Sequence, residues 1–184
     1  LNGVDGSVTV LASRTGLPLR TVAVGQNPLA LAVDETTARV FVANRKDGSV
    51  RAYDAASWKL LNSITFGDDA DNLRVDTGTG HVWVGYGSGA VAEFDVDGKR
   101  IGEIRLDAHP ESFQLEKNGA RIFVNLPKSK KIGVTDRKSR SVLAAWSTGG
   151  ALSNYPMTLN EKNHRLFVVT RAPAKLLILD TGSG

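Results

Sequence analysis

The residues that could do chemistry in this chain are few, and they gather in short polar segments between apolar runs. The 184 residues include no cysteine, which excludes disulfides, thiolate nucleophiles and cysteine-bound zinc. The three histidines are His81, His109 and His164. His109 stands beside Pro110 and Glu111, where a general base, a ligand or a hydrogen-bonded support of its loop are the roles open to it, and the last is the commonest.

The densest acidic segment contains Asp68, Asp69 and Asp71. Carboxylate oxygens packed this closely suit Ca²⁺, which takes about six to eight oxygen ligands. The segment matches no calcium-loop motif and aspartates also cap turns, so we predict no metal site and keep these three residues as weak candidates. The chain also has no G-x-S-x-G, H-E-x-x-H or phosphate-binding motif. It therefore predicts no catalytic residues and no cofactor.

The elements that must position these residues recur along the chain. Four apolar runs are copies of one segment, and their first residues are 42, 40 and 44 positions apart. The four runs are 39–44, 81–86, 121–126 and 165–170. A run before each of them and a run after each of them keep the same spacing to within one residue. Three series in one register indicate an internal repeat.

Each repeat has the pattern of strands rather than helices. The runs are short, some alternate as Val8 and Val10 do, and none shows a convincing period of 3.6 residues. The second run of each repeat is apolar on both faces, which is typical of a strand covered on both sides. Segments rich in glycine, asparagine and aspartate separate the runs, as in hairpin turns. A more polar fourth run completes the repeats at 18–24, 60–66, 100–106 and 141–146.

Four antiparallel strands in a repeat of about 42 residues are typical of a β-propeller blade. We therefore predict an all-β fold, a β-propeller of four-stranded antiparallel blades, with about 4.4 repeats in the 184 residues. Whole blades are expected at 26–67, 68–107 and 108–147, and partial blades at 1–25 and 148–184.

The repeat at 26–67 also carries a resemblance to a known family. The residues that carry it are Pro28, Asp34, the runs 39–44 and 49–54, and the segment 64–67. Together they resemble the YVTN-type β-propeller repeat, and the resemblance extends over nearly the whole chain. It implies a bacterial seven-bladed propeller of a periplasmic or extracellular type, often with no assigned activity. This chain is then expected to be a fragment of about four blades, with a closed four-bladed ring as the alternative.

In a propeller, the connections between blades and those between second and third strands share one face, which we call the loop face. These connections differ in chemistry from repeat to repeat, and loops on a rigid scaffold are where binding residues concentrate. The residues expected to bind a ligand there are Asn44, Arg45, Asp69, His109, Lys128 and Arg171. His81 and His164 fall on the opposite face, which we call the turn face, in separate blades, so they make a poor metal pair.

Charge is uneven between neighbouring repeats. Residues 68–107 hold nine acidic and four basic side chains, whereas residues 108–147 hold three acidic and eight basic ones. The opposite signs are expected to help these blades pack in register. The basic repeat has one cluster on each face, with Lys128, Lys130 and Lys131 on one and Arg137, Lys138 and Arg140 on the other. Nucleic acid needs a continuous basic surface, so it is an alternative partner and not the favoured one, despite the net charge of +4.

The sequence therefore favours a non-catalytic binding or scaffold module that recognises a protein, a peptide or a small polar ligand on the loop face. Two alternatives stay open. One is a propeller enzyme, lactonase-like or quinoprotein-like, with part of its site in further blades, and the other is a nucleic-acid binder acting through the basic repeat. No apolar stretch approaches the about 18 residues that span a bilayer, so no membrane span is expected.

Overall fold

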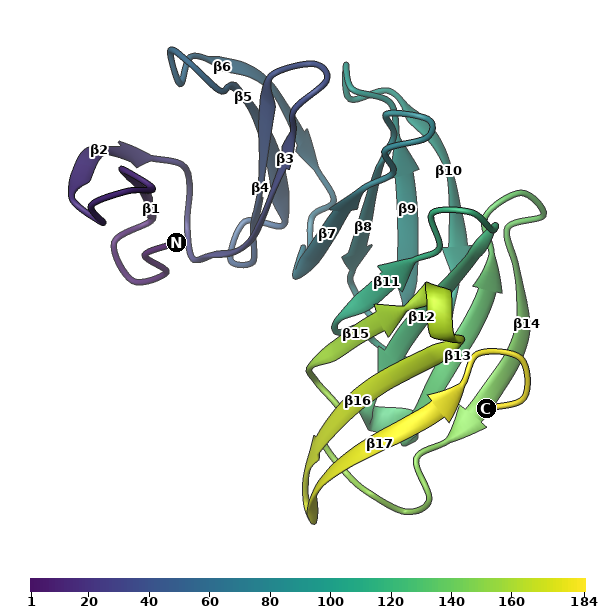
Figure 1. Ribbon diagram of the computed structural model, residues 1–184. Helices are drawn as coiled ribbons and strands as arrows, with labels where there is room; N and C mark the ends of the chain where they lie inside the picture. Colours follow the sequence, from purple (N-terminus) through teal and green to yellow (C-terminus); the bar gives the residue numbers. More distant parts are fainter.

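The computed structural model describes residues 1–184, and its regular elements are β-strands apart from two short 3₁₀ turns. The strands form five antiparallel sheets that follow one another along the chain, which we number I to V (Figure 1). Sheet I contains β1 (Ser7–Leu11) and β2 (Pro18–Ala23). Sheet II contains β3 (Pro28–Asp34), β4 (Arg39–Asn44), β5 (Ser49–Asp54) and β6 (Leu60–Thr65). Sheet III contains β7 (Asn72–Val75), β8 (Val82–Tyr86), β9 (Ala90–Phe94) and β10 (Arg100–Arg105).

Sheet IV contains β11 (Phe113–Leu115), β12 (Arg121–Leu126), β13 (Lys131–Asp136) and β14 (Ser141–Ser147). Sheet V contains β15 (Met157–Asn160), β16 (Arg165–Arg171) and β17 (Ala174–Asp180). In sheets II, III and IV the strands pair in chain order, first with second, second with third and third with fourth. The prediction of an all-β chain with four-stranded antiparallel sheets is confirmed. The chain has no helix that is long and apolar enough to cross a membrane.

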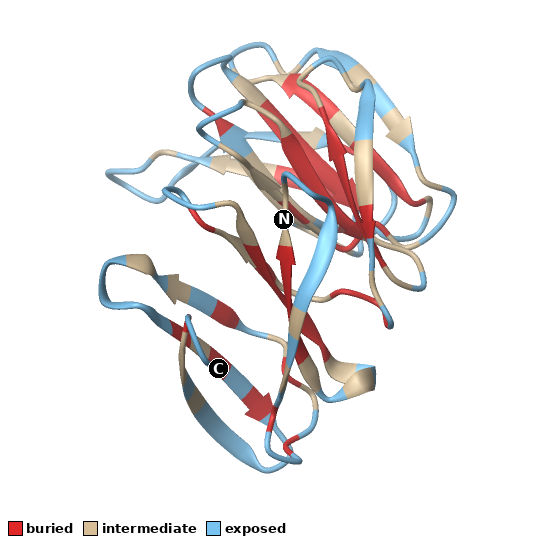
Figure 2. Ribbon diagram, turned by 90° about the vertical axis from the view of Figure 1, so that its right-hand side faces the viewer, coloured by how far each residue is buried: buried red, intermediate tan, exposed pale blue.

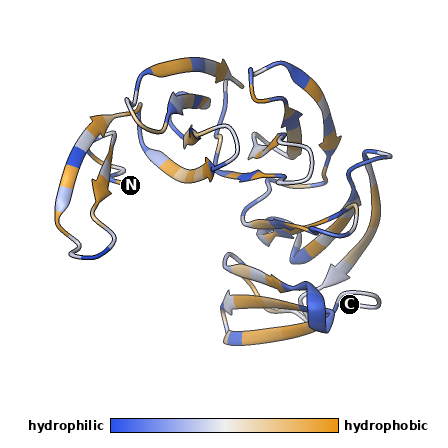
Figure 3. Cartoon of the chain, turned by 45° about the horizontal axis from the view of Figure 1, so that its top comes forward, coloured by the Kyte–Doolittle hydropathy of each residue, from blue (hydrophilic) through white to orange (hydrophobic).

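The sheets stand side by side in an open arc (Figure 3). The first strands of neighbouring sheets touch, β3 with β7, β7 with β11 and β11 with β15. The fourth strands β6, β10 and β14 are mostly exposed or half-buried, whereas the second strands β4, β8 and β12 are almost wholly buried (Figure 2). Sheets II, III and IV therefore each present their first strand to the inside of the arc and their fourth strand to the outside.

The second strands are covered on both sides because successive side chains of a strand point to opposite faces. In β4, Val40 and Val42 pack in the core between sheets I and II, and Phe41 packs in the core between sheets II and III. In β8, Val82 belongs to the core between sheets II and III, whereas Trp83 belongs to the core between sheets III and IV. This alternation explains why the second run of each repeat is apolar throughout.

The opposite charges of sheets III and IV meet across their interface. Arg137 forms an ion pair with Asp76, and its guanidinium is only 11% exposed. Arg140 and Glu93 at 2.8 Å, and Lys131 and Asp107 at 3.1 Å, also form ion pairs across this interface. The expectation that opposite signs join the two repeats is confirmed.

Candidate functional site

Five charged side chains from three successive sheets converge on the loop face, and we call them the loop-face cluster. They are Arg45, Asp69, Asp71, His109 and Glu111. The connection from β4 to β5 supplies Arg45. The connection that enters sheet III supplies both aspartates, and the connection that enters sheet IV supplies the histidine and the glutamate. Because first strands of adjacent sheets touch, these entering connections lie close together.

The cluster has an exposed rim and a buried interior. At the rim, Arg45 Nε lies 2.8 Å from Asp69 Oδ1, and the arginine side chain is 51% exposed. In the interior, His109 Nε2 lies 3.4 Å from Asp71 Oδ2 and 3.9 Å from Asp69 Oδ2. The side chains of His109 and Asp71 are each only 10% exposed.

The contacts of His109 determine its protonation. Its Nδ1 is in hydrogen-bond contact with the carbonyl oxygen of Gly87, which can only accept, so Nδ1 carries a proton. The hydrogen bond to Asp71 outweighs the desolvation of the ring and raises the pKa of His109. Folding therefore shifts the ring toward the imidazolium form, in which both nitrogens donate.

The pKa values of the two inner carboxyl groups, Asp71 and Glu111, are shifted in opposite directions. Burial alone would raise the pKa of Asp71, but hydrogen bonds from His109 and Glu111 outweigh it and lower that pKa. Burial and the negative charge of Asp71 raise the pKa of Glu111 to about 7. Asp71 therefore stays ionised, while Glu111 gains and loses a proton near neutral pH. The cluster thus places one titrating carboxyl, Glu111, beside Asp71 and His109, an arrangement suited to holding a polar ligand or moving a proton.

The same cluster contains the residues best placed to hold a metal ion. One ligand atom from each of Asp69, Asp71 and His109 lies within 4.8 Å of the others. The Gly87 carbonyl fixes the His109 proton on Nδ1, which leaves Nε2 toward the carboxylates if the ring is neutral. Asp68, the third weak candidate from the sequence, is exposed and does not belong to this set.

Four of the five cluster residues, all except Arg45, occupy one pair of positions in the repeat. His109 stands 40 residues after Asp69, and Glu111 stands 40 residues after Asp71, the spacing of the repeated strands there. The backbone confirms this equivalence, because the N–H of Asp71 donates to Gly85 and the N–H of Glu111 donates to Asn125, again 40 residues on. Sequence reasoning missed Glu111 as a site residue and kept Asp71 only as a weak metal candidate. The signal that could have found both was a titratable pair at the same two positions of adjacent repeats.

The other three predicted ligand-binding residues lie apart from the cluster. Asn44 is fully buried, and its Nδ2 donates to Val24 O and to Ser49 Oγ, both at 3.2 Å. It fills the space over Gly25, where an added Cβ would lie 2.5 Å from the Asn44 side chain. Asn44 therefore supports the connection instead of facing a ligand, which corrects the expectation for this residue.

Lys128 and Arg171 lie on the loop face of later sheets. Lys128 is exposed in the 3₁₀ turn Pro127–Ser129. The guanidinium of Arg171 stacks over the Tyr155 ring at 4.5 Å from its centroid. The structure thus brings together Arg45, Asp69 and His109 out of the six predicted residues.

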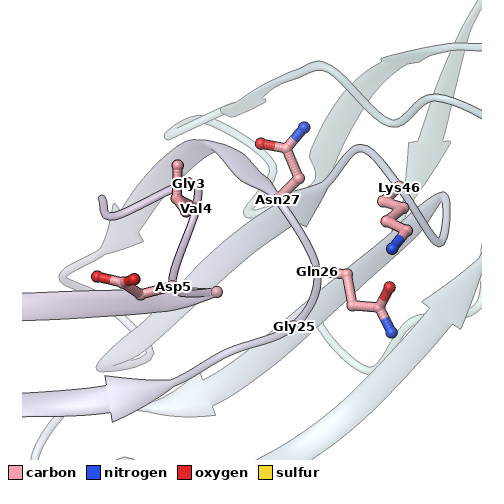
Figure 4. A pocket seen from close by; sticks show the side chains of 8 residues that line it. Gly3, Val4, Asp5, Gly25, Gln26, Asn27 and Lys46 are labelled. Atoms are coloured by element: carbon pink, nitrogen blue, oxygen red, sulfur yellow. The ribbon is translucent and has the colours of Figure 1, made fainter.

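A pocket of about 600 Å³ lies on the same face, on the other side of the β4–β5 connection from the cluster. Its lining is almost entirely polar: the side chains of Asp5, Gln26, Asn27 and Lys46, the exposed Val4, and three glycines. Figure 4 shows the Gln26 amide and the Lys46 ammonium on one side of the pocket and the Asp5 carboxylate on the other. The backbone N–H of Arg45 donates to Asn27 O, so the pocket and the cluster share one supporting connection.

The fold has a counterpart among solved structures. The chain is similar to one in the structure titled "Kuenenia stuttgartiensis Hydrazine Synthase", with a TM-score of 0.74 and 18% sequence identity. The match covers 97% of this chain and 61% of that one, so this chain spans less than two thirds of its length. At this identity the likeness shows a shared fold and nothing of activity. No protein-family model and no curated protein matches the sequence.

Proposed function

We propose that this chain is a binding module whose loop face recognises a small polar ligand. The observation that carries the proposal is the convergence of the loop-face cluster beside a pocket of about 600 Å³. The pocket offers a carboxylate, an ammonium group and two amides, together with three glycines. Such a lining suits a ligand that carries both hydrogen-bond donors and acceptors, such as an amino acid or a sugar.

A thermal-shift series with free amino acids and monosaccharides tests this proposal. We expect at least one of these classes to raise the melting temperature, because a ligand that binds only the folded chain stabilises it. Gln26→Ala and Lys46→Ala should reduce the shift, since both residues line the pocket. Lys128→Ala removes an exposed lysine from the same face and is the matched control. A series without any stabilisation, or stabilisation that both pocket variants retain in full, would overturn the proposal.

We propose further that the sheets are blades of a YVTN-type β-propeller and belong to a ring of seven. The supporting observations are the four-stranded antiparallel sheets in chain order, the repeat of about 42 residues and the open arc (Figure 3). We also propose, as part of this assignment, that the protein is located in the periplasm or outside the cell. Light scattering tests the ring assignment, because open sheet faces should drive association above the monomer mass of 19.6 kDa. A monodisperse monomer with one sharp melting transition would contradict it.

A second candidate function is a hydrolytic enzyme. It is favoured by Glu111, whose carboxyl has a pKa of about 7 beside the Asp71–His109 contact, because a group that titrates near neutral pH can act as a general acid or base. Turnover of lactones or esters that disappears in both Glu111→Gln and His109→Ala would favour this candidate over a binding module. Turnover that both variants retain would eliminate it.

A further inference from the structure

A second cavity lies on the turn face, between sheets III and IV, and is independent of the loop-face cluster. Its volume is about 480 Å³, within the range of about 300–1,000 Å³ that is typical of small-molecule pockets. The turns β7–β8, β11–β12 and β13–β14 line it, together with residues of β8, β9 and β10. We call it the turn-face pocket.

The carboxylates of this pocket are already engaged. Asp76 is the partner of the buried Arg137, whose remaining N–H groups donate to backbone carbonyls of the β11–β12 region. Both oxygens of Glu93 are also used, because Oε1 lies 2.8 Å from His81 Nδ1 and Oε2 accepts from Arg140 at 2.8 Å. The pocket therefore has no free acceptor among its acidic side chains.

Several hydrogen-bond donors of the turn-face pocket, in contrast, have no acceptor in the structure. Arg137 and Arg140 form the ion pairs of the pocket and His81 contacts Glu93, which leaves the ammonium groups of Lys117 and Lys138 without a partner. Trp83 forms part of the wall, and its Nε1–H is buried and has no acceptor. An indole N–H can only donate, and a buried donor without a partner costs stability. Four cationic side chains against two engaged carboxylates give the lining a positive balance.

We propose that the turn-face pocket binds a small organic carboxylate. The anionic end would lie between Lys117, Lys138 and the unused N–H groups of Arg140, where charge-assisted hydrogen bonds are strongest. The hydrocarbon or aromatic body would lie against Ile101, Ala120 and the Trp83 indole, the apolar part of the wall. The Trp83 indole N–H lies in this wall and is a reporter of whatever occupies the pocket.

Nuclear magnetic resonance titration with benzoate, its neutral analogue benzamide and inorganic phosphate tests the proposal. The readout is the indole N–H resonance of Trp83, identified by its loss in Trp83→Phe. We expect benzoate to shift this resonance saturably and benzamide to bind at least about tenfold more weakly, because it has no charge. Binding of benzamide with the same affinity as benzoate would refute the proposal that the pocket recognises the negative charge of a carboxylate. A shift with phosphate and none with benzoate would refute the proposal that the ligand has an organic body. The absence of a saturable shift with either anion would refute the proposal that the pocket binds an anion.

A pair of double variants separates this pocket from general surface charge. Lys117→Gln with Lys138→Gln removes two exposed ammonium groups of the pocket, and Lys128→Gln with Lys130→Gln removes two exposed ones from the loop face. Both variants lose the same net charge and both should fold, because none of the four residues is buried. We expect benzoate affinity to fall about tenfold in the first variant and to be retained in the second. An equal loss in the two variants would overturn the proposal.

Discussion

The loop face and the turn face of sheets III and IV use charge in different ways. On the loop face, Asp71 and His109 come from successive entering connections and contact each other inside a small cluster. On the turn face, Arg137 reaches across to Asp76 and fastens the two sheets together. The first arrangement leaves a carboxyl that titrates near pH 7, whereas the second leaves unpaired donors around a cavity.

The difference teaches that the well-buried ion pair between these sheets lies on the turn face, whereas the loop-face pair of Lys131 and Asp107 is half-exposed. The turns of the turn face are short hairpins whose side chains cap and cross-link, as Asp136 does for Ser139 and Arg137 for Asp76. The connections of the loop face differ from repeat to repeat, and their charged groups meet at the inside of the arc. Variants on the two faces should therefore affect stability and titration to different extents.

The largest expected effect comes from Trp83→Ala, because this residue belongs to the core that both faces share. Its side chain is 1% exposed and packs with Val91, Phe113 and Ile122 between sheets III and IV. The substitution should lower the free energy of unfolding by about 3–5 kcal/mol. Chemical denaturation measures this loss, and Trp58→Ala, which alters a half-buried tryptophan, should cost clearly less. A loss below about 1 kcal/mol would contradict the placement of Trp83 in the core.

The next largest effect is expected from Arg137→Met on the turn face. Methionine retains much of the aliphatic volume but leaves the Asp76 carboxylate, which is only 14% exposed, without a counter-charge. Breaking a buried ion pair in this way should lower the free energy of unfolding by about 3 kcal/mol. Adding Asp76→Asn should recover part of the loss, which a double-mutant cycle measures. Strictly additive effects would show that the two residues do not act as a pair.

Much of the fold could be predicted from the sequence because the repeat and the strand pattern depend on local residues. Apolar residues on both faces of 81–86 predict a strand covered on both sides, and β8 is such a strand. Packing between sheets is harder to predict, because it depends on which faces meet. The charge difference between 68–107 and 108–147 predicted attraction, but only the structure shows which side chains carry it, Arg137 and Asp76 among them.

The candidate site could be predicted in part. Arg45, Asp69 and His109 were found because they are polar residues of loop-face connections. Asn44 fits the same rule, and its burial follows from the absence of a side chain at Gly25, which is a tertiary contact. Glu111 was missed because its raised pKa depends on burial beside Asp71, and no local pattern reports burial.

A smaller effect is expected from the pH dependence of stability. Glu111 binds its proton more tightly in the folded chain, so its contribution is complete below the ordinary carboxyl pKa and is lost as pH rises through about 7. His109, whose pKa is also raised, acts in the same direction, and Asp71, whose pKa is lowered, matters only in acid. The melting temperature should therefore fall between about pH 5 and pH 8.

Glu111→Gln isolates the part of this dependence that comes from Glu111. Glutamine resembles the protonated carboxyl at every pH, so the variant should lose less melting temperature between about pH 5 and pH 8 than the parent chain. The turn-face variant Lys138→Gln is the control and should keep the parental slope, because Lys138 lies outside the cluster. Parallel curves for Glu111→Gln and the parent chain would contradict the assignment.

The smallest effect on stability is expected from Arg45→Ala, the loop-face counterpart of Arg137→Met. The Arg45 side chain is 51% exposed, so its ion pair with Asp69 is screened by water and should contribute about 0.2–1 kcal/mol. Its charge nevertheless lowers the pKa of Glu111, and removing it should move the Glu111 midpoint above about 7. Carboxyl resonances measure that midpoint, and denaturation measures the stability. A large loss of stability with an unchanged Glu111 midpoint would contradict this prediction, because the Arg45–Asp69 pair would then stabilise the fold as the Arg137–Asp76 pair is expected to do.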